Sequence, residues 1–351
     1  MTRIAYQELF DAAVEILRAC GESEDNAAIT AASICRADAR GITTHGSYLL
    51  TPIWKRVKAG QLTLPTQAKI ETDSGAVAVI DGGDGLGAVA GELALRTAIK
   101  KAKEYGVSAA LIKNTNNIGF LACYTEEAAK EGMIAIMGCN AAPAMAPWGS
   151  AEAFLGTNPI AIASYTGNDR IFSADMASSV VARGKIRKAA RNGEKIPDNW
   201  ATDGEGNFTT DPNAALKGAL LPMGGPKGSA IALAVDIISG ILSGASYAPD
   251  LKSFHEPEGR TGVGASLIVL NVSAFQSPEA FAEKMGAYTV SVKNLKKAKG
   301  FDEILMPGEI ELNRERENVE NGIPLDGNAV AAINELLNSI GSDRILGIDK
   351  E

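Results

Sequence analysis

The stretch AVAVIDGGDGLGAVA at residues 76–90 decides the fold class of this 351-residue chain. Its first part, Ala76–Ile80, alternates small and β-branched residues and predicts a strand. Gly82–Gly87 predicts a tight turn, and the apolar spacing of Ala88–Tyr105 predicts a long helix. A strand, a glycine-rich turn and a helix in succession indicate an α/β sheet.

The same stretch also contains a pattern typical of dinucleotide-binding Rossmann folds. Gly85-Leu-Gly-Ala-Val-Ala90 fits G-x-G-x-x-A between a strand and a helix. That fingerprint also needs an acidic residue at the end of the second strand, where it binds the ribose hydroxyls. The second expected strand, Val107–Ile112, is followed by Lys113-Asn114-Thr115. The acid is missing, so the ordinary Rossmann fold is disfavoured.

Further elements on either side of this stretch suggest two lobes. Helices are expected at residues 5–39 (with a break near Gly21), 49–60, Leu121–Glu131, Ser229–Ser243, Phe275–Met285 and Asn328–Ile340, and strands at Met133–Gly138, Pro159–Ser164, Ile171–Ala174 and Leu267–Val272. We therefore expect a helical lobe built from both chain ends, residues 1–70 and 290–351, and an α/β lobe at 71–289. The Gly-, Pro- and Asp-rich segment 186–228 is expected to be a long loop of the kind found at functional sites.

Composition excludes several classes of function. The chain has 34 basic and 42 acidic residues, and a net charge of −8 disfavours nucleic acid as a partner. The most apolar stretch, Ile231–Leu242, is too short and interrupted to span a membrane, and the first ten residues do not resemble a signal peptide. Four scattered cysteines without a C-x-x-C pair disfavour a metal site, and they favour a reducing, cytoplasmic location.

Histidine is scarce, since the chain has only His45 and His255. His45 follows Thr44 in the polar run Asp38–Gly46, among charged residues. Histidine can both donate and accept a proton near neutral pH, so His45 is a candidate acid/base group. His255 lies in a loop-like Ser-Phe-His-Glu-Pro segment. The alternative for a lone histidine is a polar residue without chemistry.

Three polar runs could hold an anionic cofactor. Gly156-Thr-Asn-Pro159 and Asp175-Met-Ala-Ser-Ser179 offer backbone N–H groups and hydroxyls at strand ends, although both could be locally bonded turns. Pro222–Gly228 places Lys227 at the start of an expected helix, which favours anion binding, although it could also be a flexible loop. Asn114–Gly119 on its own is read as a loop.

The ordered set of these runs resembles the malate/L-lactate dehydrogenase family of the non-Rossmann type, which includes ureidoglycolate and L-sulfolactate dehydrogenases, 2,3-diketogulonate reductase and an imine-reducing branch. The resemblance covers about residues 5–310. The motifs that carry it are Arg36–Gly41, Thr44-His-Gly46, Asn114–Gly119, Asn140-Ala-Ala-Pro143, Pro147-Trp-Gly149, Gly156–Pro159, Asp175–Ser179, Gly184-Lys-Ile186, Ile196-Pro197, Trp200, Asp203, Thr210-Asp-Pro212, Gly224–Gly228 and Pro307-Gly-Glu309.

The resemblance implies a fold and an activity. The fold is a helical lobe from both termini plus an α/β cofactor-binding lobe that is not a Rossmann fold, in homodimers with active sites near the subunit interface. The activity is hydride transfer between NAD or NADP and a small 2-hydroxy or 2-oxo acid that is malate-, lactate- or ureidoglycolate-like. The alternatives are reduction of a cyclic imino acid, or cofactor binding without dehydrogenase activity.

The resemblance also implies roles for particular residues. The catalytic group is His45, Thr44 and Asn117, with His45 as acid/base and Thr44 as its orienting or relaying hydroxyl. Substrate binding falls to Arg40, Tyr48, Arg183 and Lys185. Cofactor binding falls to Asn116, Gly119, Thr157, Asn158, Pro159, Asp175, Met176, Ala177, Lys227, Gly228, Pro307, Gly308 and Glu309.

Two positions depart from the family pattern. Asn117 stands where the family usually has a histidine, and an amide can hydrogen-bond a carbonyl but cannot exchange protons. Leu49 stands where the family often has an arginine suited to a carboxylate. Either Arg40, Arg183 or Lys185 replaces that arginine, or the substrate differs. Lys185 stands where the imine-reducing branch carries an acid, which disfavours that branch.

Overall fold

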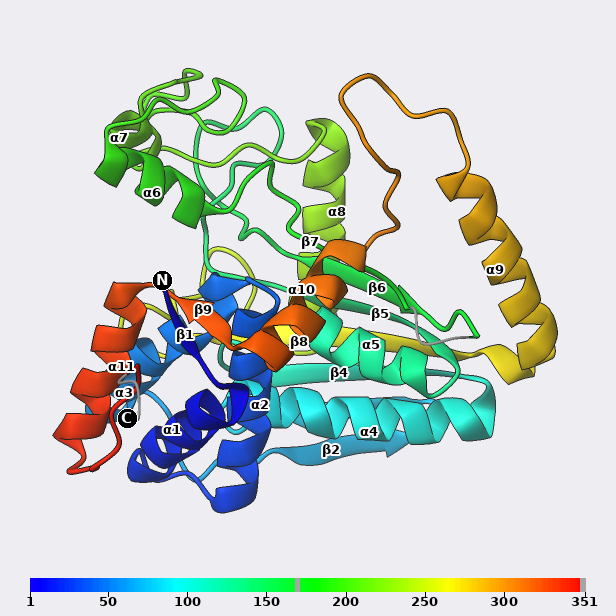
Figure 1. Ribbon diagram of the computed structural model, residues 1–351, viewed down its shortest axis with the longest axis horizontal. Helices are drawn as coiled ribbons and strands as arrows, with labels where there is room; N and C mark the ends of the chain where they lie inside the picture. The colour runs from blue at the N-terminus through cyan, green and yellow to red at the C-terminus, as the bar shows by residue number, and fades with distance from the viewer. Residues whose placement is uncertain (168–170, 348–351) are drawn as a thin grey trace.

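The computed structural model describes residues 1–167 and 171–347, and it joins a helical lobe to a seven-stranded mixed sheet (Figure 1). The α/β class expected from the sequence is therefore confirmed. The last four residues of the expected helical lobe, 348–351, lie outside the described residues.

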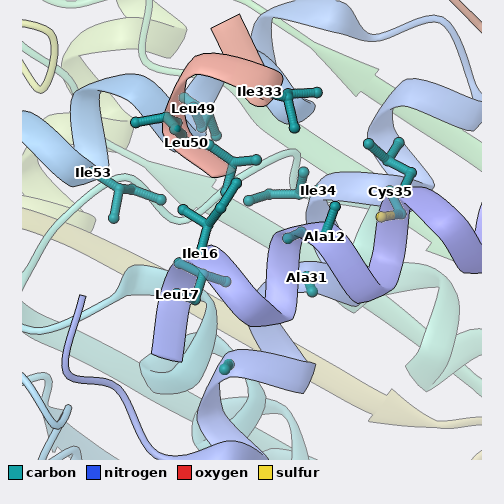
Figure 2. Close-up of a cluster of buried hydrophobic side chains, with 14 of the residues drawn as sticks. Ala12, Ile16, Leu17, Ala31, Ile34, Cys35, Leu49, Leu50, Ile53 and Ile333 are labelled. Atoms are coloured by element: carbon teal, nitrogen blue, oxygen red, sulfur yellow. The ribbon is translucent and has the colours of Figure 1, made fainter. Parts of the chain in front are cut away.

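Both chain ends build the helical lobe. Strand β1 (Thr2–Ile4) pairs antiparallel with β9 (Ile323–Leu325), which ties the start of the chain to its last helix. The helices of this lobe are α1 (Tyr6–Ala19), α2 (Glu24–Ala39), α3 (Leu50–Lys58) and α11 (Gly327–Ser339), with the 3₁₀ turns η1 (Thr43–His45) and η2 (Ser47–Leu49) between α2 and α3. Ile16, Ile34 and Leu50 meet Ile333 in their shared core, where Leu49 also lies (Figure 2).

The sheet has the strand order β2-β3-β4-β8-β5-β6-β7. Its strands are β2 (Lys69–Ser74), β3 (Val77–Asp81), β4 (Val107–Thr115), β5 (Met133–Cys139), β6 (Ile160–Ser164), β7 (Phe172–Met176) and β8 (Val263–Asn271). Only β3 and β4 run parallel, among the neighbouring pairs of this sheet in the described chain. The sequence did not predict β2, because all six of its residues are exposed and carry no buried stripe.

Helices cover both faces of the sheet. Alternate residues of a strand face opposite sides, and Ala135 and Met137 of β5 belong to the core shared with α4 (Gly87–Tyr105) and α5 (Ala122–Lys130). Gly138, the next residue of β5, faces Val235 and Ser239 on the other side. Those two residues belong to α8 (Pro226–Asp236) and to the π-helical turn η3 (Ile237–Leu242).

The helix expected at Ser229–Ser243 is therefore present as α8 and η3, beginning three residues earlier at Pro226. Part of its apolar surface is uncovered: Leu233, Ile237, Ile238, Ile241 and Leu242 are all exposed, with Leu242 67% accessible. Across residues 1–167 and 171–347, no helix combines the length and the apolar character needed to cross a membrane.

The segment 186–228 is in part the long loop expected from the sequence, since residues 193–211 and 216–225 contain no helix, but it also contains helical parts. Helix α6 (Arg183–Asn192) occupies its start and the short helix α7 (Pro212–Ala215) lies further on. Ile186 and Ala189 of α6 and Ala215 of α7 belong to a small core that also includes Leu155 and Ala232 of α8. The sequence did not predict α6, because this helix is strongly polar and buries only Ile186 and Ala189, so its apolar stripe is too narrow to dominate the pattern.

Helix α9 (Pro278–Lys293) has none of its sixteen residues buried and stands clear of the body of the molecule (Figure 1). It follows the turn η4 (Val272–Ala274) and leads through an extended segment to α10 (Glu309–Asn321), which returns to the helical lobe. Phe281 of α9 stacks on Tyr165 at 6.4 Å, but Tyr288 and Val290 are exposed by 60% and 58%, so this helix carries apolar side chains that the described residues leave largely uncovered.

The largest cores follow the two lobes. One joins residues between 4 and 89 to residues 323–346, with Phe254 added, and the other lies within residues 78–269. The lobe boundaries at residues 70 and 290 stay a prediction.

A buried ion cluster connects the lobes. Arg40 at the end of α2 is 1% exposed and donates two hydrogen bonds to Glu126 of α5, at 2.7 and 2.6 Å. Arg36 adds a bond to Glu126 at 2.8 Å, Ser173 of β7 donates another at 2.6 Å, and Glu315 of α10 accepts from both arginines. Burial alone would raise the pKa of Glu126, but the bonds and charges of Arg40 and Arg36 hold it below its usual value.

Substituting Glu126→Gln should destabilise the protein by about 3 kcal/mol, because it removes the buried carboxylate that binds Arg40 and Arg36 and leaves Glu315 as their shared partner in the cluster. The free energy of unfolding is measured by denaturant titration. Glu92→Gln is the matched control, since Glu92 pairs with the exposed Arg96 on the surface of α4 and should cost less than about 1 kcal/mol. Equal losses for both variants would contradict a structural role for the cluster.

Candidate active site

A small pocket, with a cavity volume of about 20 Å³, lies where the helical lobe meets the end of β4 and the start of α4. Its lining comes from α2, from the turns around His45 and Leu49, from the first residues of α4, from Asn116, Asn117 and Gly119, and from Phe254. We call it the His45 pocket. It brings two of the three expected catalytic residues, His45 and Asn117, to one cavity together with Asn116 and Gly119, while Thr44 lies beside His45 without lining it.

The turn that carries His45 is fixed by a buried carboxylate. Asp38 is 3% exposed, and its Oδ2 accepts the N–H of Ser47 at 2.7 Å. A side chain at Gly46 would overlap the Asp38 carboxylate, so only glycine fits there. Burial raises the pKa of Asp38 to about 6, against the hydrogen bonds from Ser47, which lower it. Asp38 therefore holds the turn in place.

His45 is a half-buried imidazole with one partner. Its Nδ1 lies 3.0 Å from the Thr44 hydroxyl, and Nε2 has no partner among the described residues. Burial lowers the pKa of His45 from 6.5 to about 4, and the charge of nearby His255 acts in the same direction. The ring is therefore neutral at pH 7 and able to accept a proton.

Asn116 and Asn117 have different environments. The Asn116 amide nitrogen donates to the carbonyls of Asp84 and Gly85, and its oxygen accepts from Thr261, so this side chain is engaged within the protein. The Asn117 oxygen accepts the N–H of Gly119 at 2.9 Å, while its amide nitrogen has no partner within the described chain. Asn117 thus keeps a free donor in the pocket.

The glycines of the Rossmann-like pattern serve packing within the protein. A side chain at Gly87 would overlap the backbone carbonyl of Asn117, and one at Gly85 would overlap Thr66. Glycine at both positions therefore lets the start of α4 approach its neighbours closely. The sequence argument against an ordinary Rossmann site agrees with this role.

The pocket lacks the expected arginine. Leu49 and Ile53, both buried, form an apolar wall with Phe254, and no arginine lines the cavity in the described chain. Arg40 cannot take over without breaking the buried cluster, because its guanidinium is bound to Glu126 and Glu315. These bonds speak against the substrate-binding role expected for Arg40.

The other residues expected to bind substrate lie around the pocket without lining it. Helix α6 begins close to the His45 turn, since a Cβ at Gly184 would lie 3.6 Å from the Thr44 methyl group. Arg183 donates to the Leu216 carbonyl at 2.8 Å, and Lys185 is exposed. Tyr48 is 58% exposed, and its ring lies 5.7 Å from that of His255.

Two of the polar runs expected to bind cofactor lie side by side. Ile160 of β6 pairs with Met176 of β7, which places Thr157–Pro159 next to Asp175–Ala177. Asn158 is buried, and its amide bonds Ala141 and Ala232, so it acts as a local brace. Asp175 is exposed, and its Oδ2 accepts the N–H of Ala122 at the start of α5, just after Gly119.

The remaining segments flank this pair. Met223 donates its N–H to the Ser178 carbonyl, which places the turn before α8 beside Asp175–Ala177. Gly228 packs on the backbone of Met223 in this turn. Lys227 is exposed and has no partner among the described residues. The Pro307 carbonyl accepts the N–H of Ser173, Gly308 packs against Ser173, and Glu309 pairs with Lys293 at 2.7 Å.

Sequence reasoning missed the loop that closes one wall of the pocket. Phe254 lines the cavity, and His255 next to it faces Tyr48. Arg56, which is 0% exposed, holds this loop by donating to the carbonyls of Glu256 and Gly259, both at 2.7 Å. Arg56 and Glu256 are 200 positions apart in the sequence, so no local sequence pattern predicts their contact. Nowhere in the described chain do three or more potential metal ligands gather.

The malate/L-lactate dehydrogenase family profile matches residues 4–334. The chain belongs to this family. It is 42% identical to an L-sulfolactate dehydrogenase of Methanocaldococcus jannaschii, over 93% of this chain and 94% of the relative. A Pyrococcus horikoshii malate dehydrogenase is 35% identical, over 97% and 96% of the two chains, and an Escherichia coli K12 ureidoglycolate dehydrogenase is 32% identical, over 87% of each.

Solved structures agree with the family assignment. The M. jannaschii sulfolactate dehydrogenase superposes with a TM-score of 0.92 at 40% identity, covering 97% of this chain and 98% of its own. The P. horikoshii malate dehydrogenase gives 0.89 at 34% identity, with 98% and 97% covered. The expected non-Rossmann dehydrogenase fold is therefore confirmed, and the chain is a dehydrogenase that acts on a CH–OH group.

The pKa of His45 should be about 4 in the free protein, as measured by proton NMR titration of the ring Hε1. Only two histidines are present, so a His255→Gln variant assigns both resonances, and it should raise the His45 pKa by removing a positive neighbour. The unfolded chain binds this proton more tightly than the folded protein does. The contribution of His45 to the free energy of unfolding should therefore fall as the pH drops from 6.5 toward 4. A His45 pKa near 6.5 would show that the ring is freely hydrated.

Proposed function

We propose that this dehydrogenase transfers hydride between NAD or NADP and a small 2-hydroxy or 2-oxo acid of the malate, lactate or ureidoglycolate kind. The observation that carries the proposal is the His45 pocket, where the neutral imidazole and the free amide of Asn117 face one cavity. The names of the relatives support the substrate class, since they include sulfolactate, malate and ureidoglycolate dehydrogenases.

His45 is the proton-transfer group of this proposal. A hydroxy acid must lose its hydroxyl proton when it is oxidised, and neutral His45 accepts that proton while Thr44 orients the ring through Nδ1. In the reverse direction His45 must carry the proton to the carbonyl oxygen. A bound carboxylate favours this, because a negative charge near the imidazole raises its pKa. Asn117 donates its amide N–H to the same oxygen and polarises it.

The residues around β6, β7 and α8 fit a nicotinamide dinucleotide. Lys227 and the first-turn amides of α8 offer donors to phosphate groups, and the exposed Asp175 carboxylate suits ribose hydroxyls. Thr157, Met176, Ala177, Gly228 and the turn Pro307–Glu309 surround them. A bound nicotinamide supplies or accepts the hydride at the carbon that carries the hydroxyl.

A His45→Gln variant should lose turnover by about a hundredfold or more while it still binds the cofactor, because glutamine cannot exchange the proton. A panel of 2-oxo acids and cyclic imino acids is screened with NADH and NADPH by absorbance, and cofactor binding is measured by fluorescence. Thr44→Val should lower turnover less, and Thr43→Val, an exposed neighbour on the same turn, serves as the control.

Undiminished turnover in the His45→Gln variant would remove the acid/base assignment. Activity confined to imino acids would favour the imine-reducing alternative. Cofactor binding without oxidation by any member of the panel would favour a cofactor-binding protein without dehydrogenase activity.

We also propose a homodimer, with the active sites near the subunit interface, in the cytoplasm. The exposed apolar side chains of α8 and η3, and the uncovered helix α9, support a second copy as the partner. The four free cysteines support a reducing compartment.

An Ile241→Glu variant should shift the protein from dimer to monomer in light scattering after size-exclusion chromatography, because it buries a charge in the proposed interface. Ile241 is 55% exposed within one chain, so the fold itself should tolerate the change. Tyr105→Glu, at an exposed apolar residue at the end of α4, should leave the dimer intact. A monomeric wild type, or a dimeric Ile241→Glu variant, would refute this interface.

A further inference from the structure

We propose that His255 and Arg187 bind the carboxylate of the substrate at the mouth of the His45 pocket, in place of the arginine that Leu49 replaces. The proposal rests on the proposed function, since it names the group that anchors a 2-hydroxy or 2-oxo acid. It assigns the anchor to two residues that the family motifs did not single out.

The carboxylate needs a partner that the pocket itself does not contain. Leu49, Ile53 and Phe254 make one wall apolar, and the polar side chains that line the pocket, among them His45 and Asn117, carry no positive charge at neutral pH. A carboxylate buried beside them without a positive partner would be strongly disfavoured. Within the described chain the cation therefore comes from the rim, because Arg40 is held in the buried cluster.

His255 lies on the loop that contributes the Phe254 wall. Its exposed ring lies 5.7 Å from the Tyr48 ring and 6.2 Å from that of Phe254. Arg56 is the positioning residue for this loop, because its buried guanidinium binds the backbone on both sides of Pro257 and lies 5.7 Å over the Phe254 ring. His255 is thus held at the rim next to a residue that lines the cavity.

Arg187 lies on α6 three residues after Gly184, so it is on the same helix face as the position that lies closest to the His45 turn. The start of this helix lies next to Thr44, and Arg183, one turn before Arg187, is tied to the Leu216 carbonyl. Burial lowers the pKa of His255, and the positive charge of Arg187 lowers it further, which agrees with the two groups being neighbours. Glu256 is the acid that acts on His255 in the opposite sense.

Arg187 has no competing anion within the described chain, where no carboxylate lies within 4 Å of its guanidinium. A guanidinium without an ion-pair partner and an imidazole beside a pocket entrance form an anion site. Charge-assisted hydrogen bonds from the guanidinium strengthen the binding of a carboxylate there. The substrate carbonyl then points inward to His45 and Asn117, while its carboxylate stays at the rim.

The test compares a charged probe with a neutral one on the cofactor-loaded enzyme. Oxamate carries the carboxylate of a 2-oxo acid, and ethyl oxamate lacks its charge. Arg187→Gln and His255→Gln should each weaken oxamate binding by about tenfold, measured by calorimetry, and should leave ethyl oxamate unchanged. Lys188→Gln removes the same charge from the next position of α6 and should change oxamate binding by less than about twofold.

Two further readouts separate an anchor from a structural role. Oxamate should shift the NMR signal of His255 in the wild type, and Arg187→Lys should recover part of the affinity. With a 2-oxo acid substrate, the rim variants should raise KM about tenfold with little loss of kcat, whereas His45→Gln lowers kcat. Equal effects of Arg187→Gln and Lys188→Gln, or equal loss of both probes, would overturn the proposal and leave the dehydrogenase function standing. A wild-type enzyme that turns over no 2-oxo acid would instead refute the proposed function.

Discussion

The placement of the two lobes depends on the buried pair of Arg40 and Glu126. Each charge has left water, and each is satisfied only when α2, α5 and α10 meet. Arg40 lies five residues before His45, and Glu126 lies nine residues after Asn117, so the pair fixes both sides of the pocket at once. The cluster therefore fixes the positions of residues around the His45 pocket, although none of its own atoms line that pocket. Arg40 has a structural role because its guanidinium is bound within the cluster.

The glycines near the start of α4 also have a structural role, although their spacing is typical of a binding site. Gly85 and Gly87 satisfy a well-known nucleotide-binding spacing, yet the atoms that approach them belong to Thr66 and to the Asn117 backbone. Close approach of a helix end to a neighbouring strand needs glycine whether the neighbour is a cofactor or protein. The glycine spacing therefore indicated tight packing, and the missing acid after the second strand indicated that the fold is not an ordinary Rossmann fold.

Much of the architecture could be predicted from local sequence patterns, because apolar residues recur at regular spacing in amphipathic helices such as α1 and in buried strands such as β5. The exposed edge strand β2 and the polar helix α6 left none, since neither buries a wide apolar face. The candidate site divided in the same way. The motifs around His45 and Asn117 were visible, whereas the loop that bears His255 reaches the rim only through Arg56, a contact between distant segments. Arg40 looked available because a sequence does not show which carboxylates will surround a guanidinium.

The central strand of the sheet is late in the chain, and this has a consequence for synthesis. Strand β8, residues 263–271, lies between β4 and β5 and is antiparallel to both. Until it leaves the ribosome, the earlier strands wait with open edges on both sides of a gap, and such edges invite pairing with other chains. The two half-sheets, complete once residue 176 has been made, therefore have open edges until about three-quarters of the chain has been translated, so protection of those edges matters for biogenesis.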